Sequence, residues 1–225
     1  MTGLRGTLVV SAVVLCLLAL AAPSALADIF TSTLGTGNDA LSGFSGPYAE
    51  LTIDLTSSTT AIVTFVSDVV GGNIYLLGDG GSVDVNVNAA SWTIGSFTAS
   101  NAGTGFTPGP LSDGGSGNVD GFGVFNQTIN SFDGFTHSSD TISFTLTNTG
   151  GTWASAANVL VANADGNDAA AHIFVTSFPA DASNGALATG FAAEGAVAAP
   201  EPSSLVLLLT GLIGFAGTRR RKPLA

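Results

Sequence analysis

Oxygen-bearing side chains beside glycine turns are the residues of this sequence best suited to chemistry. Residues 35–43 read Gly-Thr-Gly-Asn-Asp-Ala-Leu-Ser-Gly and match one copy of a glycine-rich calcium-binding nonapeptide. Neighbouring repeats must share their ligands to enclose an ion, so a single copy does not complete a site. Residues 163–168, Asn-Ala-Asp-Gly-Asn-Asp, lack the ligand spacing and final Glu of an EF-hand loop. Ordinary glycine turns are the simpler interpretation of both, and Asp39, Asp165 and Asp168 are the positions to test for Ca²⁺.

Residues that could support catalysis are few. The chain has two histidines, His137 and His172, and it contains no Gly-x-Ser-x-Gly elbow, His-Glu-x-x-His pair or phosphate-binding glycine loop. Its aspartates mostly alternate along expected strands or lie in turns, so no carboxylate pair is visibly positioned for glycoside hydrolysis. The sequence therefore predicts no catalytic residue and no enzyme. An exported hydrolase is the alternative, and it requires two carboxylates that converge in one cleft.

Opposite charges are segregated along the chain. The five basic residues are Arg5 and the cluster Arg219–Lys222, whereas all 16 acidic residues fall between Asp28 and Glu201. The middle of the chain cannot form salt bridges with Lys or Arg, and it cannot neutralise phosphates, which excludes nucleic acid as a partner. The single cysteine, Cys16, precedes this region, so no disulfide is expected there.

The first 27 residues have the pattern of a secretory signal peptide. Arg5 supplies the positive charge, residues 8–22 form an apolar run, and Ala25 and Ala27 provide the small residues required before a cleavage site at Asp28. A permanent membrane anchor is the alternative, but the run is short and ends at a proline. A lipid attached to Cys16 is disfavoured because Leu15 is larger than the residue that lipidation requires.

The C-terminal residues 200–225 combine three features in a fixed order. Pro200-Glu201-Pro202 is followed by an apolar segment, 203–218, and then by Arg219, Arg220, Arg221 and Lys222. A helix over 203–218 would be about 24 Å long, which is short for a bilayer core of about 30 Å unless the arginines snorkel. The basic cluster favours the cytoplasmic side, so the body of the chain is expected outside the inner membrane.

This ending resembles the PEP-CTERM sorting signal, which is read by exosortase, a membrane-embedded enzyme of the cysteine-transpeptidase type. The resemblance covers residues 198–222. It implies that Pro200, Glu201 and Pro202 are recognised, with processing close to them and with Arg219, Arg220 and Arg221 as the basic end. It also implies a Gram-negative host that makes exopolysaccharide. The expected route is transient anchoring in the inner membrane, followed by release to the cell envelope or extracellular matrix.

The central region has the two-residue periodicity of β-strands. Apolar and polar residues alternate over 51–56, 61–65, 83–88 and 142–147, and further strands are expected at 73–77, 91–98, 122–129 and 172–178. Eight or nine such strands predict an all-β fold with a single antiparallel β-sandwich over residues 28–178. We expect a long loop at 104–120, a short helix within 153–160, and an Ala/Gly-rich linker over 179–199.

These features favour a non-enzymatic structural or adhesive protein of the cell surface or exopolysaccharide matrix. A strand surface rich in Ser, Thr, Asn and Gly offers neutral hydrogen-bonding groups to exopolysaccharide or to a second copy of the chain. No cofactor is expected apart from the Ca²⁺ to be tested. The alternative is a Ca²⁺-dependent module that binds carbohydrate or a surface.

Overall fold

The structure is a computed structural model that describes residues 28–194. The predicted signal peptide (1–27), with Ala25 and Ala27, and the predicted sorting segment (200–225), with its helix at 203–218, lie outside the described residues. Strands are the dominant elements of the described chain, and its helices are four single 3-10 turns. Its elements are β1 (Asp28–Leu34), β2 (Thr36–Gly37), η1 (Asp39–Leu41), β3 (Ala49–Ser57), β4 (Thr60–Ser67), β5 (Val69–Val70), β6 (Asn73–Leu77), β7 (Asp79–Val85), β8 (Trp92–Ser100), β9 (Ser112–Val119), β10 (Gly123–Ser131), η2 (Phe135–His137), β11 (Thr141–Asn148), η3 (Ala156–Asn158), β12 (Ala169–Ser177), η4 (Ala182–Asn184) and β13 (Ala188–Ala193).

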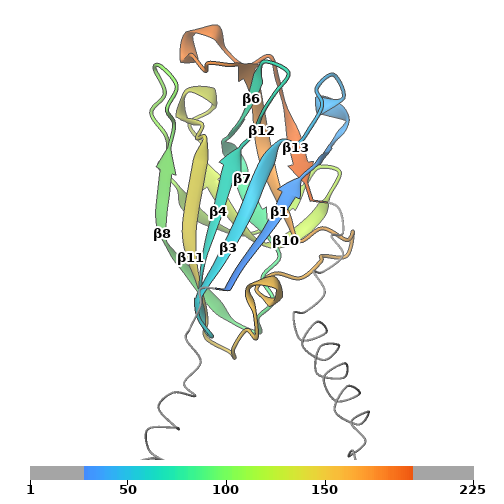
Figure 1. The fold of residues 1–225 in the computed structure, drawn as a ribbon, viewed down its shortest axis with the longest axis vertical. Helices are drawn as coiled ribbons and strands as arrows, with labels where there is room; N and C mark the ends of the chain where they lie inside the picture. The colour runs from blue at the N-terminus through green and yellow to red at the C-terminus, as the bar shows by residue number, and fades with distance from the viewer. Residues whose placement is uncertain (1–27, 195–225) are drawn as a thin grey trace, which may run out of the picture.

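Two antiparallel sheets face each other (Figure 1). The smaller sheet has the order β1-β3-β4-β11-β8. The larger sheet has the order β2-β13-β12-β7-β10-β9, and β6 pairs with the other end of β12 while β5 pairs with β6. Every strand pair in both sheets is antiparallel, as the sequence predicted.

The core lies between the sheets and is built from the alternating positions that the sequence shows. The smaller sheet contributes Leu51, Ile53, Val63, Phe65, Ile142, Phe144 and Leu146, and the larger sheet contributes Leu77, Val83, Val85, Ile129, Ile173, Val175 and Ala192, all fully buried or nearly so. Because side chains on a strand alternate between faces, the intervening Thr, Ser and Asp residues point away from this core. The predicted all-β, sandwich-like fold is confirmed for residues 28–194.

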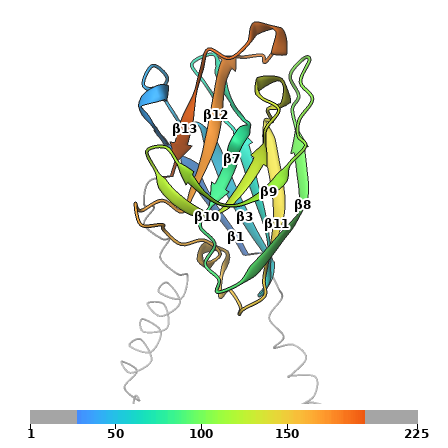
Figure 2. The same cartoon turned by 180° about the vertical axis from the view of Figure 1, so that it is seen from behind.

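The outer face of the larger sheet is covered by its own hairpin. Val119 at the end of β9, Phe122 in the turn and Phe125 in β10 pack on Ala170 of β12 and Ala193 of β13. Figure 2 shows β9 and β10 curving across this face. The tip is tied to the start of η1, because Asn38 Nδ2 donates a hydrogen bond to the Asp120 carboxylate (3.1 Å). This packing buries the outer face of β12 at Ala170, and Phe106 and Phe135 belong to the separate cluster that covers Phe174.

Three boundaries drawn from the sequence were wrong. Residues 112–119 of the expected 104–120 loop form β9, and residues 188–193 of the expected 179–199 linker form β13. The expected helix within 153–160 is limited to the single 3-10 turn η3. β1 was not among the expected strands either. β9 and β13 consist mostly of glycine, alanine and small polar residues, with Val119 and Phe191 as the large apolar exceptions. These two strands pair through backbone hydrogen bonds and through the close approach of neighbouring strands. Such pairing does not require the alternation of apolar and polar residues by which a strand is recognised in a sequence.

Within residues 28–194, no helix has the length and apolar character needed to span a bilayer.

Candidate functional site

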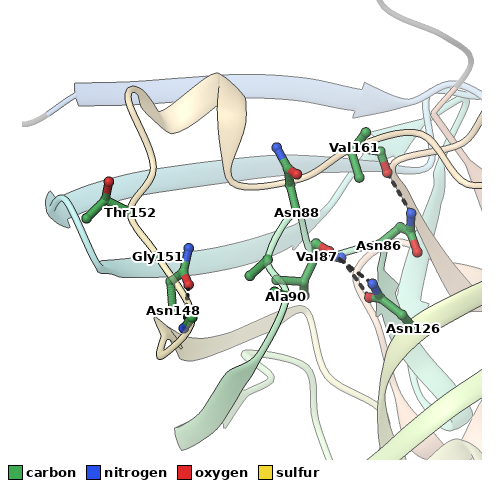
Figure 3. A pocket seen from close by; sticks show the side chains of 11 residues that line it. Asn86, Val87, Asn88, Ala90, Asn126, Asn148, Gly151, Thr152 and Val161 are labelled. Carbon is green, nitrogen blue, oxygen red and sulfur yellow. Dashed lines mark hydrogen bonds between the residues drawn. The ribbon is translucent and has the colours of Figure 1, made fainter.

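An open, amide-rich pocket lies where β10 meets the segments that follow β7 and β11. We call it the asparagine pocket, and it has a volume of about 360 Å³. It is lined by Asn86, Val87, Asn88, Ala89, Ala90, Asn126, Asn148, Gly150, Gly151, Thr152 and Val161. Figure 3 shows the four asparagines grouped around the segment that leaves β7. No charged side chain contributes to this lining.

The asparagines hold the pocket open through contacts with the backbone. The Val87 N–H donates to Asn126 Oδ1 (2.7 Å), and Asn126 Nδ2 donates to the Val87 carbonyl (3.0 Å), so one side chain replaces a strand partner. Asn86 Nδ2 donates to the Val161 carbonyl, and Asn88 Nδ2 donates to the Asn158 carbonyl, both at 2.9 Å. Within residues 28–194, the Oδ1 atoms of Asn86 and Asn88 accept no hydrogen bond. These oxygens are free to accept from a ligand hydroxyl.

A second pocket of about 260 Å³ lies between the outer face of β7 and the overlying β9. We call it the Asp84 pocket. Its lining comprises Gly80, Gly81, Asp84, Gly114, Ser116, Gly117, Asn118, Val119, Thr128, Asn130 and Phe191. The glycines leave room for its polar groups: a Cβ on Gly117 would lie 2.6 Å from Thr128 Oγ1, and one on Gly81 would lie 2.9 Å from Asp84 Oδ2.

Asp84 is the only carboxylate in the lining of this pocket, and it is fully buried. Neither of its oxygens has a hydrogen-bond partner in the described part of the chain, and the Thr128 hydroxyl also lacks one. Burial raises the pKa of Asp84 to about 7, and the nearby Thr128 hydroxyl lowers it without completing a hydrogen bond. A buried carboxylate without a hydrogen-bond partner lowers the stability of the folded state, and native proteins rarely contain one.

A second buried acid, Glu194, lies at the end of β13 and also has a raised pKa, about 7. Burial is the main cause. The Ser32 hydroxyl of β1 lowers the pKa without a complete hydrogen bond, and the Asp168 carboxylate raises it. Burial also raises the pKa of Asp168. Glu194 and Asp168 are therefore two neighbouring acids, and neither lines either of the two pockets.

The three candidate calcium ligands occupy separate settings. Asp39 begins η1, Asp165 lies in the turn at 163–167 beside Gly123, and Asp168 lies beside Glu194. Within residues 28–194, no group of three or more His, Cys, Asp or Glu side chains is arranged to hold a metal ion. The turn at 163–167 is organised by Asn163 Oδ1, which accepts from the N–H groups of Asp165 and Asn167. Calcium binding at these positions stays a prediction.

Neither histidine lines the asparagine pocket or the Asp84 pocket. His137 Nδ1 is 2.9 Å from the Gly109 carbonyl, and His172 stacks on Phe191 with ring centroids 4.6 Å apart. Burial lowers the pKa of His172, and the Asp79 carboxylate and the carbonyls of Gly78 and Gly80 raise it. The aromatic stack places His172 beside the Asp84 pocket, because Phe191 also lines that pocket.

Asp84 was missed by the sequence reasoning because it alternates with Val83 and Val85, as a solvent-facing residue would. The available signal was glycine: Gly80 and Gly81 precede Asp84, and Gly114 and Gly117 lie on the strand that covers it. Asp28, the residue after the predicted cleavage point, is the first residue of β1, and its carboxylate accepts from the Ala156 N–H (2.7 Å).

Comparison with known proteins places one motif on the chain. The model of the PEP-CTERM protein-sorting motif matches residues 198–222, which include Pro200, Glu201, Pro202 and the three arginines. No curated protein and no solved structure matches the chain. The described region is an all-β domain with two polar pockets. The chain therefore carries a PEP-CTERM sorting motif, and this motif implies sorting by exosortase, with export, a membrane-anchored intermediate and delivery to the cell surface.

Proposed function

We propose that this protein is a non-enzymatic structural or adhesive component of the cell surface or exopolysaccharide matrix of a Gram-negative bacterium. The asparagine pocket is the observation that carries the proposal. Its lining of neutral amides, backbone and small side chains matches the hydroxyl groups of a polysaccharide, which both donate and accept hydrogen bonds. The free Oδ1 atoms of Asn86 and Asn88 are positioned to accept from such hydroxyls.

The charge of the domain supports a neutral partner. Of the 16 acidic residues, only Glu201 lies beyond residue 194, so 15 belong to the described region, which contains no Lys or Arg. A surface with this charge repels acidic polymers unless cations bridge them. Neutral polysaccharide avoids that cost.

The arrangement of carboxylates supports a role without catalysis. Hydrolysis of a glycosidic bond needs two carboxylates on opposite sides of the bond. The asparagine pocket has no carboxylate in its lining, and the Asp84 pocket has one. The neighbouring acids Glu194 and Asp168 lie outside both linings.

The proposal is tested by deleting the gene in its host and measuring matrix composition, flocculation and cell adhesion. Purified exported protein, produced from the full-length chain, is then tested for adsorption to neutral exopolysaccharide from the same host. We expect Asn88→Ala to weaken adsorption several-fold, because it removes a free acceptor and the bond to Asn158. Asn184→Ala is the control, since Asn184 is exposed in η4, away from the pocket lining. An unchanged matrix in the deletion strain, together with no adsorption, would refute the proposal.

A further inference from the structure

We propose that the Asp84 pocket is a binding site for a single neutral sugar ring, with Asp84 and Thr128 as the residues that receive its hydroxyl groups. This inference deepens the proposed function and rests on it in one respect: a protein of the cell surface or matrix encounters sugars there. It names a second site, separate from the asparagine pocket in both lining and chemistry.

Two buried polar side chains without partners meet in this pocket. Asp84 is 0% exposed and Thr128 is 6% exposed. The two Asp84 oxygens and Thr128 Oγ1 have no hydrogen-bond partner within residues 28–194. Buried polar groups are nearly always hydrogen-bonded, so the native chain pays a penalty here that a ligand can remove. A carboxylate that accepts from two adjacent hydroxyls of one ring would satisfy both of its oxygens at once.

The rest of the lining offers both donors and acceptors, which favours a hydroxyl-rich ligand over a cation. Asn130 uses Oδ1 to accept from the Gly81 N–H (2.8 Å), which leaves its amide N–H groups to donate. Ser116 donates to the Phe125 carbonyl (2.8 Å) and keeps its oxygen as an acceptor. Phe191 adds an apolar face for the C–H groups of a ring. A simple cation would require acceptors alone.

The space is open because glycine forms part of the wall. A side chain on Gly117 would lie against Thr128 Oγ1, and a side chain on Gly81 would lie against Asp84 Oδ2. Gly81 also has a φ of 65°, which strains other residues, whereas the φ of Gly117 is not left-handed. The cavity of about 260 Å³ falls just below the ~300–1,000 Å³ typical of drug-sized ligands. This size suits one ring.

Calorimetric titration of the exported protein with a panel of neutral monosaccharides (glucose, galactose, mannose, fucose and xylose) tests the inference. Methylammonium is the cationic probe, and short oligomers of any sugar that binds distinguish a free sugar from the end residue of a polymer. We expect at least one neutral sugar to bind. At pH 8, where Asp84 is mostly ionised, Asp84→Asn should weaken that binding about ten- to hundredfold, because the group lost is a charged acceptor. Thr128→Val, which removes only the hydroxyl, should weaken it less.

Matched controls separate the pocket from the fold. Glu194→Gln neutralises the other buried acid whose pKa is about 7, and it should leave sugar binding unchanged. Gly117→Ala should block the pocket, whereas Gly95→Ala, with no heavy atom within 4 Å of its Cβ, should not. Thermal melts of each variant show that it is folded.

Three results would overturn the inference: no sugar of the panel binds, a sugar binds equally well to the Asp84→Asn variant, or methylammonium alone binds. Failure here is distinct from failure of the proposed function. If the protein adsorbs to matrix polysaccharide while the Asp84 pocket binds no sugar, only the inference is lost. If a sugar binds in this pocket while the deletion strain has a normal matrix and the protein does not adsorb to exopolysaccharide, only the proposed function is lost.

Discussion

At the scale of single residues, the two buried acids set an unusual dependence of stability on pH. Burial raises the pKa values of Asp84 and Glu194 to about 7. The folded state therefore holds these two protons more tightly than the unfolded chain does. Their contribution to stability is complete below the unfolded pKa values near 4, and it is lost as the pH rises through about 7. For Asp84, the full shift corresponds to an energy on the order of 4 kcal/mol.

His172 acts in the opposite direction, because burial lowers its pKa. Its protonation in the unfolded chain favours unfolding as the pH falls below about 6.5. The effects of the acids and of His172 on stability are therefore best separated above pH 6.5, because His172 is largely neutral there in both the folded and the unfolded state.

We predict that the domain becomes more stable as the pH is lowered from 8 to 6.5, by about 1–2 kcal/mol for the two acids together. At pH 8, Asp84→Asn and Glu194→Gln should each raise the melting temperature, because each removes a buried charge without a cationic partner. The gain is about 2–4 °C per kcal/mol for a domain of this size. Scanning calorimetry of the single and double variants at several pH values measures this. If the double variant keeps the pH dependence of the natural chain, the assignment to these two acids is wrong.

At the scale of strands, sequence patterning predicted most of the elements that face the main core, although it missed β1, which contributes Leu34. Leu51 and Ile53 on β3, and Ile142 and Phe144 on β11, alternate with polar residues and are buried between the sheets. β9 and β13 were not predicted because their pairing depends on the small size of their side chains. Gly114 and Gly117 let β9 lie against Asn130 and Thr128. The pockets could not be predicted either, since each is assembled from strands far apart in the sequence.

Gly190 tests whether β13 is an integral strand. Its missing side chain lets η1 pack on the strand: a Cβ there would lie 2.7 Å from Asn38 Oδ1 and 2.9 Å from Leu41 Cγ. We predict that Gly190→Ala lowers the free energy of unfolding by about 1–3 kcal/mol through overpacking. Chemical denaturation measures the loss. Gly43→Ala is the control, because no heavy atom lies within 4 Å of its Cβ and its φ is not left-handed. Equal stability of the two variants would mean that η1 does not pack on β13 as described.

At the scale of the whole molecule, the separation of charge along the chain means that sorting changes the composition of the protein. The described domain is held together by burial and by hydrogen bonds among Ser, Thr, Asn and backbone groups, since residues 28–194 contain no Lys or Arg. All basic residues belong to segments that export would remove or hold at the membrane: Arg5 precedes the predicted cleavage point at Asp28, and Arg219–Lys222 end the matched motif. A chain processed at both ends would have no lysine or arginine at all.

Trypsin cleaves only after lysine or arginine, so processing at both ends makes the mature chain resistant even when it is unfolded. We predict that protein collected from the culture supernatant keeps its full mass after trypsin treatment in urea, whereas the unprocessed chain is trimmed at both termini. Mass spectrometry after chymotrypsin, which can use the 14 phenylalanines, then locates both ends. We expect the mature chain to begin at Asp28, which places its new amino group at the start of β1. Trypsin fragments that end at Arg219, Arg220 or Arg221 in the exported protein would show that the tail is retained, and release by exosortase would then be excluded.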